Sequence, residues 1–281
     1  SDEEQEKVTI YEVDFLDEKS LKGLPKDLDV AYFLMHSLTA GSKLFSSKEI
    51  QLAENFVQYI DTTSAEQTIY LGGISNDSDL SDHLKSRQKT GSILATSKVP
   101  LTALRAAIII GSGGASFEII RDLVEKLPVM IAPKWLDTKC QPIGIRNVIE
   151  YLLKACGNKA IYNKTFDIGG PEVLTYKEML LQFAAVRKMK RWIGTVPIMT
   201  PKLSSYWLYF VTSTSYYLAA NLVDSMKNEV VVKQGNIGEY IKLDLISYKE
   251  NVAFAFKRIE QNTVVSSWTD SELLRKGQSL N

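Results

Sequence analysis

Apolar and polar residues alternate along the first part of the chain in a pattern that predicts separate strands. Four segments are rich in β-branched and aromatic residues, which strands favour. They are residues 8–15 (VTIYEVDF), 29–36 (DVAYFLMH), 67–74 (QTIYLGGI) and 100–110 (PLTALRAAIII). We therefore expect four strands within the first 110 residues.

Helical periodicity appears between and after these strands. Residues 45–60 place apolar side chains on one helical face, and Ser46 with Glu49 has the spacing of a capping box at the start of a helix. A second helix is expected within residues 111–127, after a glycine-rich turn, and a third begins at Thr175, with Glu178 three residues later. The pattern predicts helices that alternate with the strands.

This alternation is typical of an α/β fold, in which helices flank a parallel sheet. Ligands of such sheets bind at the carboxyl ends of the strands. The segments expected at that edge are residues 14–15, 35–37, 72–75 and 110–114.

Composition narrows the functional classes. The chain has 281 residues, 45% of them hydrophobic, which is enough to bury a sizeable core, and its 33 basic residues balance 33 acidic ones. Without a basic surplus, nucleic acid is not an expected partner. Cys140, Cys156, His36 and His83 lack the spacings of zinc sites, so we expect no metal. The acidic start SDEEQEK is unlike a signal peptide, which favours a cytoplasmic protein.

Six segments follow one another in the order of a known family: VDFLD, AYFLMHS, YLGGI, LRAAIIIGSG, QPIGIRNVIEYLL and FDIGGPEVLTYKEML. In this series the chain resembles the atypical, NmrA-like short-chain dehydrogenase/reductases, in particular a bacterial branch with an extra C-terminal domain. The resemblance spans residues 8–269 and implies a Rossmann-like fold that binds NAD or NADP. It places Asp14 and Phe15 beside the adenine. It also implies further cofactor-binding positions, at Met35, His36, Ser37, Gly72, Ile110 and Gly111.

The chain departs from this family at its start. Family members open with a strand, a GxxGxxG turn and a helix whose N-terminus holds the pyrophosphate, and no such segment precedes Val8. We therefore expect a partial Rossmann-like domain at residues 1–170 that lacks its first βαβ unit. Residues 171–281 should form a mainly helical subdomain and the start of a further, truncated domain. A chain of this kind should bind nicotinamide cofactors weakly or not at all, and a version extended at the N-terminus should bind in the micromolar range or tighter.

A second glycine-rich turn needs separate consideration. Residues 111–116 (GSGGAS) follow a strand and precede a helix, and Asp137 lies about where a ribose-binding acid would stand. The third glycine of the motif is replaced by Ser116. We favour a turn that flanks a pocket over a dinucleotide site.

His83 and Arg87 are the candidate catalytic pair. In the family a Tyr and a Lys, four residues apart, follow this strand, and the resemblance puts His83 and Arg87 at their positions. The spacing keeps both side chains on one helical face, which we expect to open toward the cavity beside Gly72, His36 and Ile110. The imidazole of a histidine can still transfer a proton near neutral pH. An arginine, however, stays protonated, whereas the pKa of a lysine can shift with its surroundings. A solvated surface pair is the alternative.

Residues 203–223 carry no charge and six aromatic side chains. Seven Ser, Thr and Asn residues interrupt the stretch, so buried helices are favoured over a transmembrane span. The expected buried side chains are Tyr206, Trp207, Phe210 and Tyr217. An apolar substrate pocket, or a surface for self-association or docking, is the functional alternative.

The expected activity is hydride transfer between NAD(P)(H) and a small apolar carbonyl or quinone-like substrate. The alternative is a nucleotide-sensing or assembly protein that keeps the fold without turnover. The exchange at His83 and Arg87 favours the alternative, whereas the aromatic segment favours the enzyme.

Overall fold

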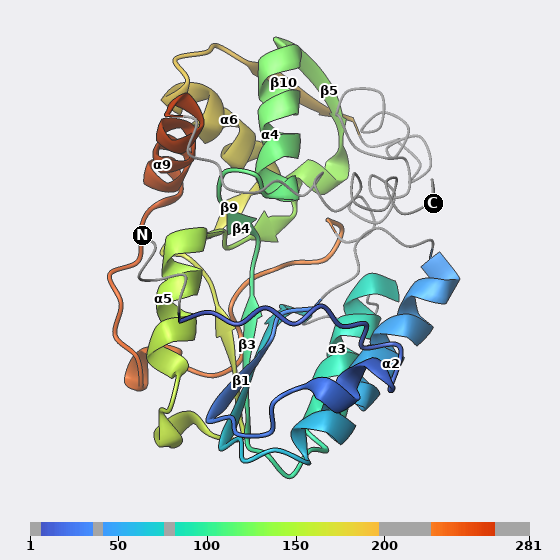
Figure 1. Cartoon of the computed structure of the whole chain (residues 1–281). Helices are drawn as coiled ribbons and strands as arrows, with labels where there is room; N and C mark the ends of the chain where they lie inside the picture. The colour runs from blue at the N-terminus through green and yellow to red at the C-terminus, as the bar shows by residue number, and fades with distance from the viewer. Residues whose placement is uncertain (1–6, 36–41, 76–81, 197–225, 262–281) are drawn as a thin grey trace.

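The computed structural model describes residues 7–35, 42–75, 82–196 and 226–261, with the backbone alone at 42–47 and 82–86 (Figure 1). Its main sheet has four parallel strands in the order β1-β2-β3-β8. These are β1 (Val30–Phe33), β2 (Gln67–Gly73), β3 (Leu101–Ala106) and β8 (Lys164–Ile168). The α/β fold class with a parallel sheet is thereby confirmed.

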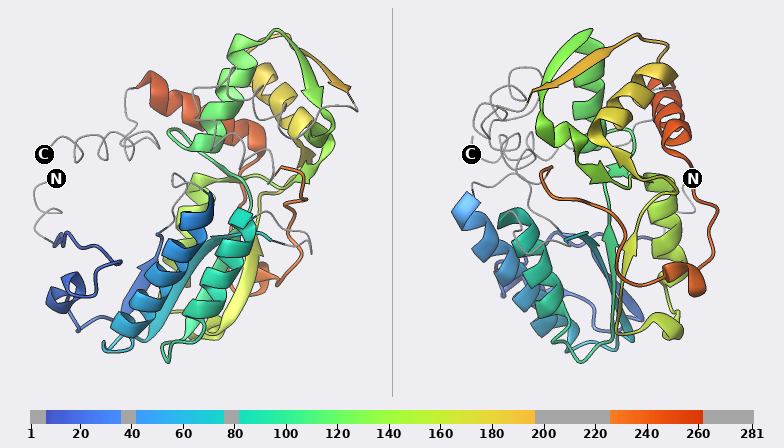
Figure 2. Two further views of the ribbon diagram at one scale, coloured as in Figure 1. Left: turned by 90° about the vertical axis from the view of Figure 1, so that its right-hand side faces the viewer. Right: turned by 180° about the vertical axis from the view of Figure 1, so that it is seen from behind.

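Helices cover both faces of this sheet, as a parallel sheet requires. On one face, α2 (Ser42–Ile60) and α3 (Asp82–Leu94) pack over β1 and β2 around Phe33, Phe56 and Tyr70. On the other face, α5 (Ile145–Ala155) packs over β3 and β8. Residues 226–247, which we call the strap, run along β8 and α5 toward the C-terminal helix (Figures 1 and 2).

A second group of elements lies beyond the carboxyl ends of the strands (Figure 2). Its core combines α4 (Ala115–Lys126), α6 (Tyr176–Val186) and α9 (Tyr248–Glu260) with the parallel pair β5 (Val129–Pro133) and β10 (Trp192–Val196). This core takes residues from both sides of the expected boundary at residue 170, and the division into domains stays a prediction. 

Short strand pairs and 3-10 turns complete the described part of the chain. β4 (Ile109–Ile110) pairs in parallel with β7 (Ile143–Gly144), and β6 (Lys139–Cys140) pairs antiparallel with β9 (Leu174–Thr175). The 3-10 turns are η1 (Ser20–Gly23), η2 (Lys134–Asp137), η3 (Lys159–Ile161) and η4 (Ile237–Glu239).

Two sequence-based expectations about elements are wrong. Residues 8–15 form no strand: they pair with no neighbour in the described structure, and Val8 and Ile10 are mostly exposed. β propensity needs a partner strand to take effect, and no strand of the described ranges pairs with this segment. The capping box at Ser46 is also wrong because α2 already begins at Ser42. Glu49 therefore lies inside the helix, where it is buried.

Other expectations hold with changed bounds. The strand expected at residues 100–110 divides into β3 and β4, and the helix expected at 111–127 begins at Ala115. The capping box of Thr175 and Glu178 is confirmed at the start of α6. Residues 203–223 lie outside the described residues. Within the described ranges, no helix is both long and apolar enough to cross a membrane, and no cluster of His, Cys, Asp and Glu could hold a metal.

Candidate functional site

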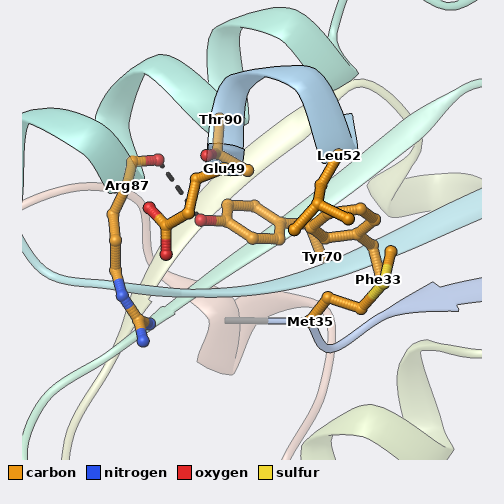
Figure 3. Close-up of a pocket in the computed structure, with 7 residues that line it drawn as sticks. All are labelled: Phe33, Met35, Glu49, Leu52, Tyr70, Arg87 and Thr90. Carbon is orange, nitrogen blue, oxygen red and sulfur yellow. Dashed lines mark hydrogen bonds between the residues drawn. The ribbon is translucent and has the colours of Figure 1, made fainter. Parts of the chain in front are cut away.

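The carboxyl ends of β1 and β2 meet α2 and α3 at a small hollow (Figure 3). Its volume is about 10 Å³, room for one water molecule. The side chains that line it come from both strands and both helices: Phe33, Met35, Glu49, Leu52, Tyr70, Arg87 and Thr90. Figure 3 shows polar groups around the hydroxyl end of Tyr70 and apolar groups at the other end of its ring.

Tyr70 is positioned by glycine. Its ring leans along β2 over Gly72, where an added Cβ would lie 2.8 Å from the ring, and it also contacts Gly91 of α3. The Tyr70 hydroxyl donates a hydrogen bond of 3.2 Å to the carbonyl oxygen of Arg87. Burial raises the pKa of Tyr70; the Arg87 charge opposes that shift and Glu49 adds to it. Tyr70 is therefore a neutral phenol at physiological pH.

Two polar atoms in this hollow have no protein partner within the described structure. They are Nε of Arg87 and Oγ1 of Thr90, both buried. Buried donors without partners are costly, so an ordered water in the hollow would satisfy them. As it stands, the hollow fits a bridging water and excludes a substrate.

A buried ion pair lies on the other half of the carboxyl edge. Asp167 of β8 accepts hydrogen bonds from Arg105 Nε at 2.7 Å, and from the backbone N–H groups of Lys233 and Gln234 at 3.0 and 2.8 Å. The Asp167 side chain is fully buried. Sequence reasoning missed this pair, although Arg105 near the end of LTALRA and Asp167 near the end of KTFDI are opposite charges in two otherwise largely apolar strand ends, which is a usable signal.

Several predicted cofactor-binding residues take part in other contacts. Asp14 accepts the N–H of Leu16 in a local turn, and the ring of Phe15 packs against Phe56 of α2, while its carbonyl oxygen accepts a hydrogen bond from Asn55 at 2.7 Å. These contacts attach the segment to α2. The adenine role of Asp14 and Phe15 remains a proposal.

The structure brings only some of the predicted site residues together. Met35 and Arg87 line the same hollow, and Arg87 also lies against the end of β2, 3.6 Å from where a Cβ on Gly73 would stand. The Gly72 position is covered by the Tyr70 ring on this face. By contrast, the side chain of Ile110 belongs to the core around α4 and α6.

Other predicted residues are described in part or not at all. Gly111 is buried against Ile145 of α5. His36 and Ser37 lie outside the described residues. His83 does belong to α3, four residues before Arg87, but its side chain is not among those described.

The glycine-rich turn at residues 111–114 ends in the N-terminus of α4. Gly113 adopts a positive φ of 79°, which only glycine accepts readily, and Gly114 is the N-cap. The carboxylate of Glu118 accepts the N–H of Gly113, so the helix supplies its own anion at this end. Burial nevertheless raises the pKa of Glu118 overall. The arrangement favours the structural turn over a pyrophosphate site.

Neither a protein-family model nor a curated protein sequence matches this chain. Solved structures do match it. Triphenylmethane reductase from Citrobacter sp. superimposes with a TM-score of 0.73 at 16% identity, covering 92% of this chain and 86% of that chain. A structure of that reductase complexed with NADP(H) gives a TM-score of 0.69 at 15% identity, covering 90% and 85%.

Two further enzymes match almost as well. A nucleoside-diphosphate-sugar epimerase from Staphylococcus aureus has a TM-score of 0.70 at 15% identity, covering 90% of this chain and 86% of that chain. The Bordetella bronchiseptica enzyme WbmG, in complex with NAD and UDP, has a TM-score of 0.66 at 11% identity, covering 89% and 78%. The chain therefore has the Rossmann-type α/β fold of these reductases and epimerases, as its resemblance to atypical short-chain dehydrogenase/reductases predicted.

Proposed function

We propose that this protein is an NAD(P)(H)-binding oxidoreductase of the atypical, NmrA-like short-chain dehydrogenase/reductase type. The observation that supports it is the fold: four parallel strands in the order β1-β2-β3-β8, shared along about nine tenths of the chain with reductases and epimerases, two of them described in complex with NAD or NADP(H). The cofactor would lie across the carboxyl ends of these strands. Its substrate would be a small apolar carbonyl or quinone-like molecule.

Arg87 is the residue on which this proposal makes its sharpest claim. It reaches the end of β2 from α3, and its Nε has no protein partner among the described residues. A guanidinium binds ribose or phosphate oxygens through several donors in a fixed geometry. Arg87 would therefore hold the cofactor, and His83, one helical turn earlier, would transfer the proton.

The second candidate function is nucleotide sensing without turnover. Two features of the hollow favour it. Tyr70 has a raised pKa and its hydroxyl is bonded to the backbone of Arg87, so it is a poor proton donor. Arg87 stands where the family has a lysine, and its guanidinium stays protonated throughout a reaction.

Calorimetric titration with NADPH tests cofactor binding. We expect saturable but weak binding, because at the glycine-rich start of α4 the Glu118 carboxylate already accepts the N–H of Gly113. Arg87→Gln should weaken binding by about tenfold or more, as expected for the loss of a charged hydrogen bond. Arg87→Lys should weaken it less, because the charge is kept. The matched control is Arg258→Gln, an exposed position on α9, which should leave the affinity unchanged.

Turnover separates the two candidate functions. NADPH oxidation with menadione, a quinone acceptor, should be measurable in the parent protein and reduced by His83→Gln, with NADPH affinity unchanged. Binding of NADPH without any oxidation across aldehyde, ketone and quinone acceptors would favour the sensing function. Absence of NADPH and NADH binding at millimolar concentration would contradict both.

A further inference from the structure

A larger cavity lies away from the hollow at Arg87. It is lined by α5, the carboxyl end of β8 and the strap, it opens to solvent, and its volume is about 360 Å³. Figure 1 shows the strap, in orange, passing α5 on its way to α9. The apolar part of the wall comes from Ile168, Val232, Ile237, Ile241, Leu243 and Leu245. Cavities of this size and character bind small molecules in other proteins.

Three polar side chains in the wall are already satisfied. Both carboxylate oxygens of Asp167 accept hydrogen bonds, from Arg105 and from the strap. The amide of Gln141 donates to the Gly170 carbonyl at 2.7 Å and accepts from Val232 at 3.1 Å. Asn236 donates to the Glu239 carboxylate at 3.1 Å. These groups shape the cavity and have little capacity left for a ligand.

Two further polar side chains have no such partner within the described structure. Tyr151 of α5 lines the cavity, and its hydroxyl makes no hydrogen bond to a described residue. A tyrosine hydroxyl in the wall of a cavity can donate a hydrogen bond to a ligand there. Lys242 also lines the cavity, on the exposed part of the strap, and its ammonium group forms no ion pair with a described residue.

The charges in the wall indicate the sign of the ligand. The one carboxylate that lines the cavity, Asp167, is neutralised by Arg105, whose Nη2 lies 2.6 Å away. Lys242 is then the uncompensated charge among the described lining residues, and Tyr151 can donate a hydrogen bond. Both groups favour an anionic or strongly accepting head group.

From these observations we propose that the cavity under the strap binds a small amphipathic carboxylic acid. The carboxylate accepts a hydrogen bond from Tyr151 and faces Lys242, and the apolar body lies against the leucine and isoleucine wall. This site is separate from the cofactor site proposed above and does not depend on it.

Octanoate is a suitable probe, with 1-octanol as the matched uncharged probe. For a ligand with about ten non-hydrogen atoms, typical ligand efficiencies give a Kd of about 1 mM. Binding in this range is measured by backbone amide NMR. We expect octanoate to shift the amide signals of residues 235–245 and α5 in a saturable manner, and 1-octanol to bind more weakly.

Three variants define the site. Tyr151→Phe should weaken octanoate binding by about tenfold, the effect of one charge-assisted hydrogen bond. Lys242→Gln should weaken octanoate severalfold and leave 1-octanol unchanged. Leu245→Trp should abolish binding of both probes by filling the cavity. Tyr59→Phe is the matched control. The Tyr59 hydroxyl donates to the Pro25 carbonyl on the other side of the sheet, so this variant should bind octanoate like the parent protein.

Thermal unfolding of each variant shows whether it is folded, and Tyr151→Phe and Lys242→Gln leave the apolar core intact. The proposal is overturned if octanoate causes no saturable shift in residues 235–245 at tens of millimolar. It is equally overturned if both Tyr151→Phe and Leu245→Trp bind octanoate like the parent, or if the shifts centre on Met35 and Arg87.

Discussion

Asp167 connects two neighbouring strands and the strap through a single carboxylate. It pairs with Arg105 on β3 and accepts two backbone N–H groups of the strap, and its side chain is fully buried. A buried carboxylate is stable only when its charge is compensated and its oxygens are hydrogen-bonded. The geometry meets both conditions, so this residue fixes the strap to the edge of the sheet.

We predict that Asp167→Asn lowers the free energy of unfolding by about 3–5 kcal/mol, because it removes the carboxylate charge that faces Arg105 in a largely buried position. Urea unfolding at pH 7 measures the change. The matched control is Glu66→Gln, which breaks the exposed Lys159–Glu66 pair at 3.2 Å and should cost less than about 1 kcal/mol. Equal losses in the two variants would show that Asp167 has no special role.

Gly72 shows how a glycine expected to bind a cofactor can have a packing role. The ring of Tyr70 occupies the space where its side chain would stand. Gly72→Ala should cost about 1–3 kcal/mol in unfolding free energy through overpacking. In a Tyr70→Leu background the same substitution should cost much less. A double-mutant cycle in urea measures the coupling, and additive effects would refute the contact as the cause.

The residues of the site were only partly predictable. Met35 and Arg87 were expected there because the ends of parallel strands converge at one edge. Glu49 was missed because its spacing from Ser46 matched a capping box. In the structure α2 begins earlier, at Ser42, so Glu49 lies within the helix and lines the hollow. Thr90 and Tyr151 carry no local sequence signal, since burial of a lone hydroxyl depends on tertiary packing.

At the scale of elements, the start of α6 follows its local sequence: the capping box predicted from Thr175 and Glu178 is present in the structure. Thr175 accepts the N–H of Glu178 at 3.1 Å, and the Glu178 carboxylate accepts the N–H of Thr175 at 2.7 Å. These hydrogen bonds hold the pKa of Glu178 below its usual value. The strand expected at residues 8–15 is the contrasting case, because a strand needs a partner that the local sequence does not specify.

The lowered pKa of Glu178 predicts a pH dependence. Its contribution is present above the unfolded pKa of about 4.3 and is lost as the pH falls through the lower folded pKa. Gln still fits the capping box but lacks the charge, so Glu178→Gln should destabilise the protein by only about 0.3–1 kcal/mol at pH 7. The difference should shrink as the pH falls below about 4. Urea unfolding of both proteins across this range measures it.

Glu118 serves as a control for this pH dependence, because its pKa is shifted in the direction opposite to that of Glu178. Burial raises its pKa, so the folded protein favours the protonated form, and that contribution is lost as the pH rises through the folded pKa. The difference between parent and Glu118→Gln should change with pH in the direction opposite to that of Glu178→Gln. Parallel trends would mean that global charge, and not these two sites, sets the pH response.

At the scale of the whole molecule, the strap ties the main sheet to the elements beyond its carboxyl edge. Asn147 of α5 is buried, donates to the Asp244 carbonyl at 3.1 Å and accepts the N–H of Ile246 at 3.0 Å. The next residues start α9, where Asn251 contacts Gly144 so closely that no Cβ would fit there. The α/β class was predictable from the alternating pattern, but this long-range connection was not.

Asn147→Ala should release the strap from α5. We predict faster amide exchange in residues 240–260, while β2 and β3 keep their protection, because their hydrogen bonds do not depend on Asn147. Hydrogen–deuterium exchange with mass spectrometry measures both regions in one experiment. An equal loss of protection in all regions would indicate global destabilisation and contradict a local connection.

The outer edge of β1 has a consequence for handling the protein in solution. Among the described residues β1 pairs only with β2, and Tyr32 and Leu34 are partly exposed beside that open edge. Open, apolar strand edges promote aggregation. With equal numbers of acidic and basic residues and an isoelectric point near 6.7, the molecule has little net charge at neutral pH to keep copies apart. Colloidal solubility should be lowest near that pH and should rise in mildly alkaline buffer.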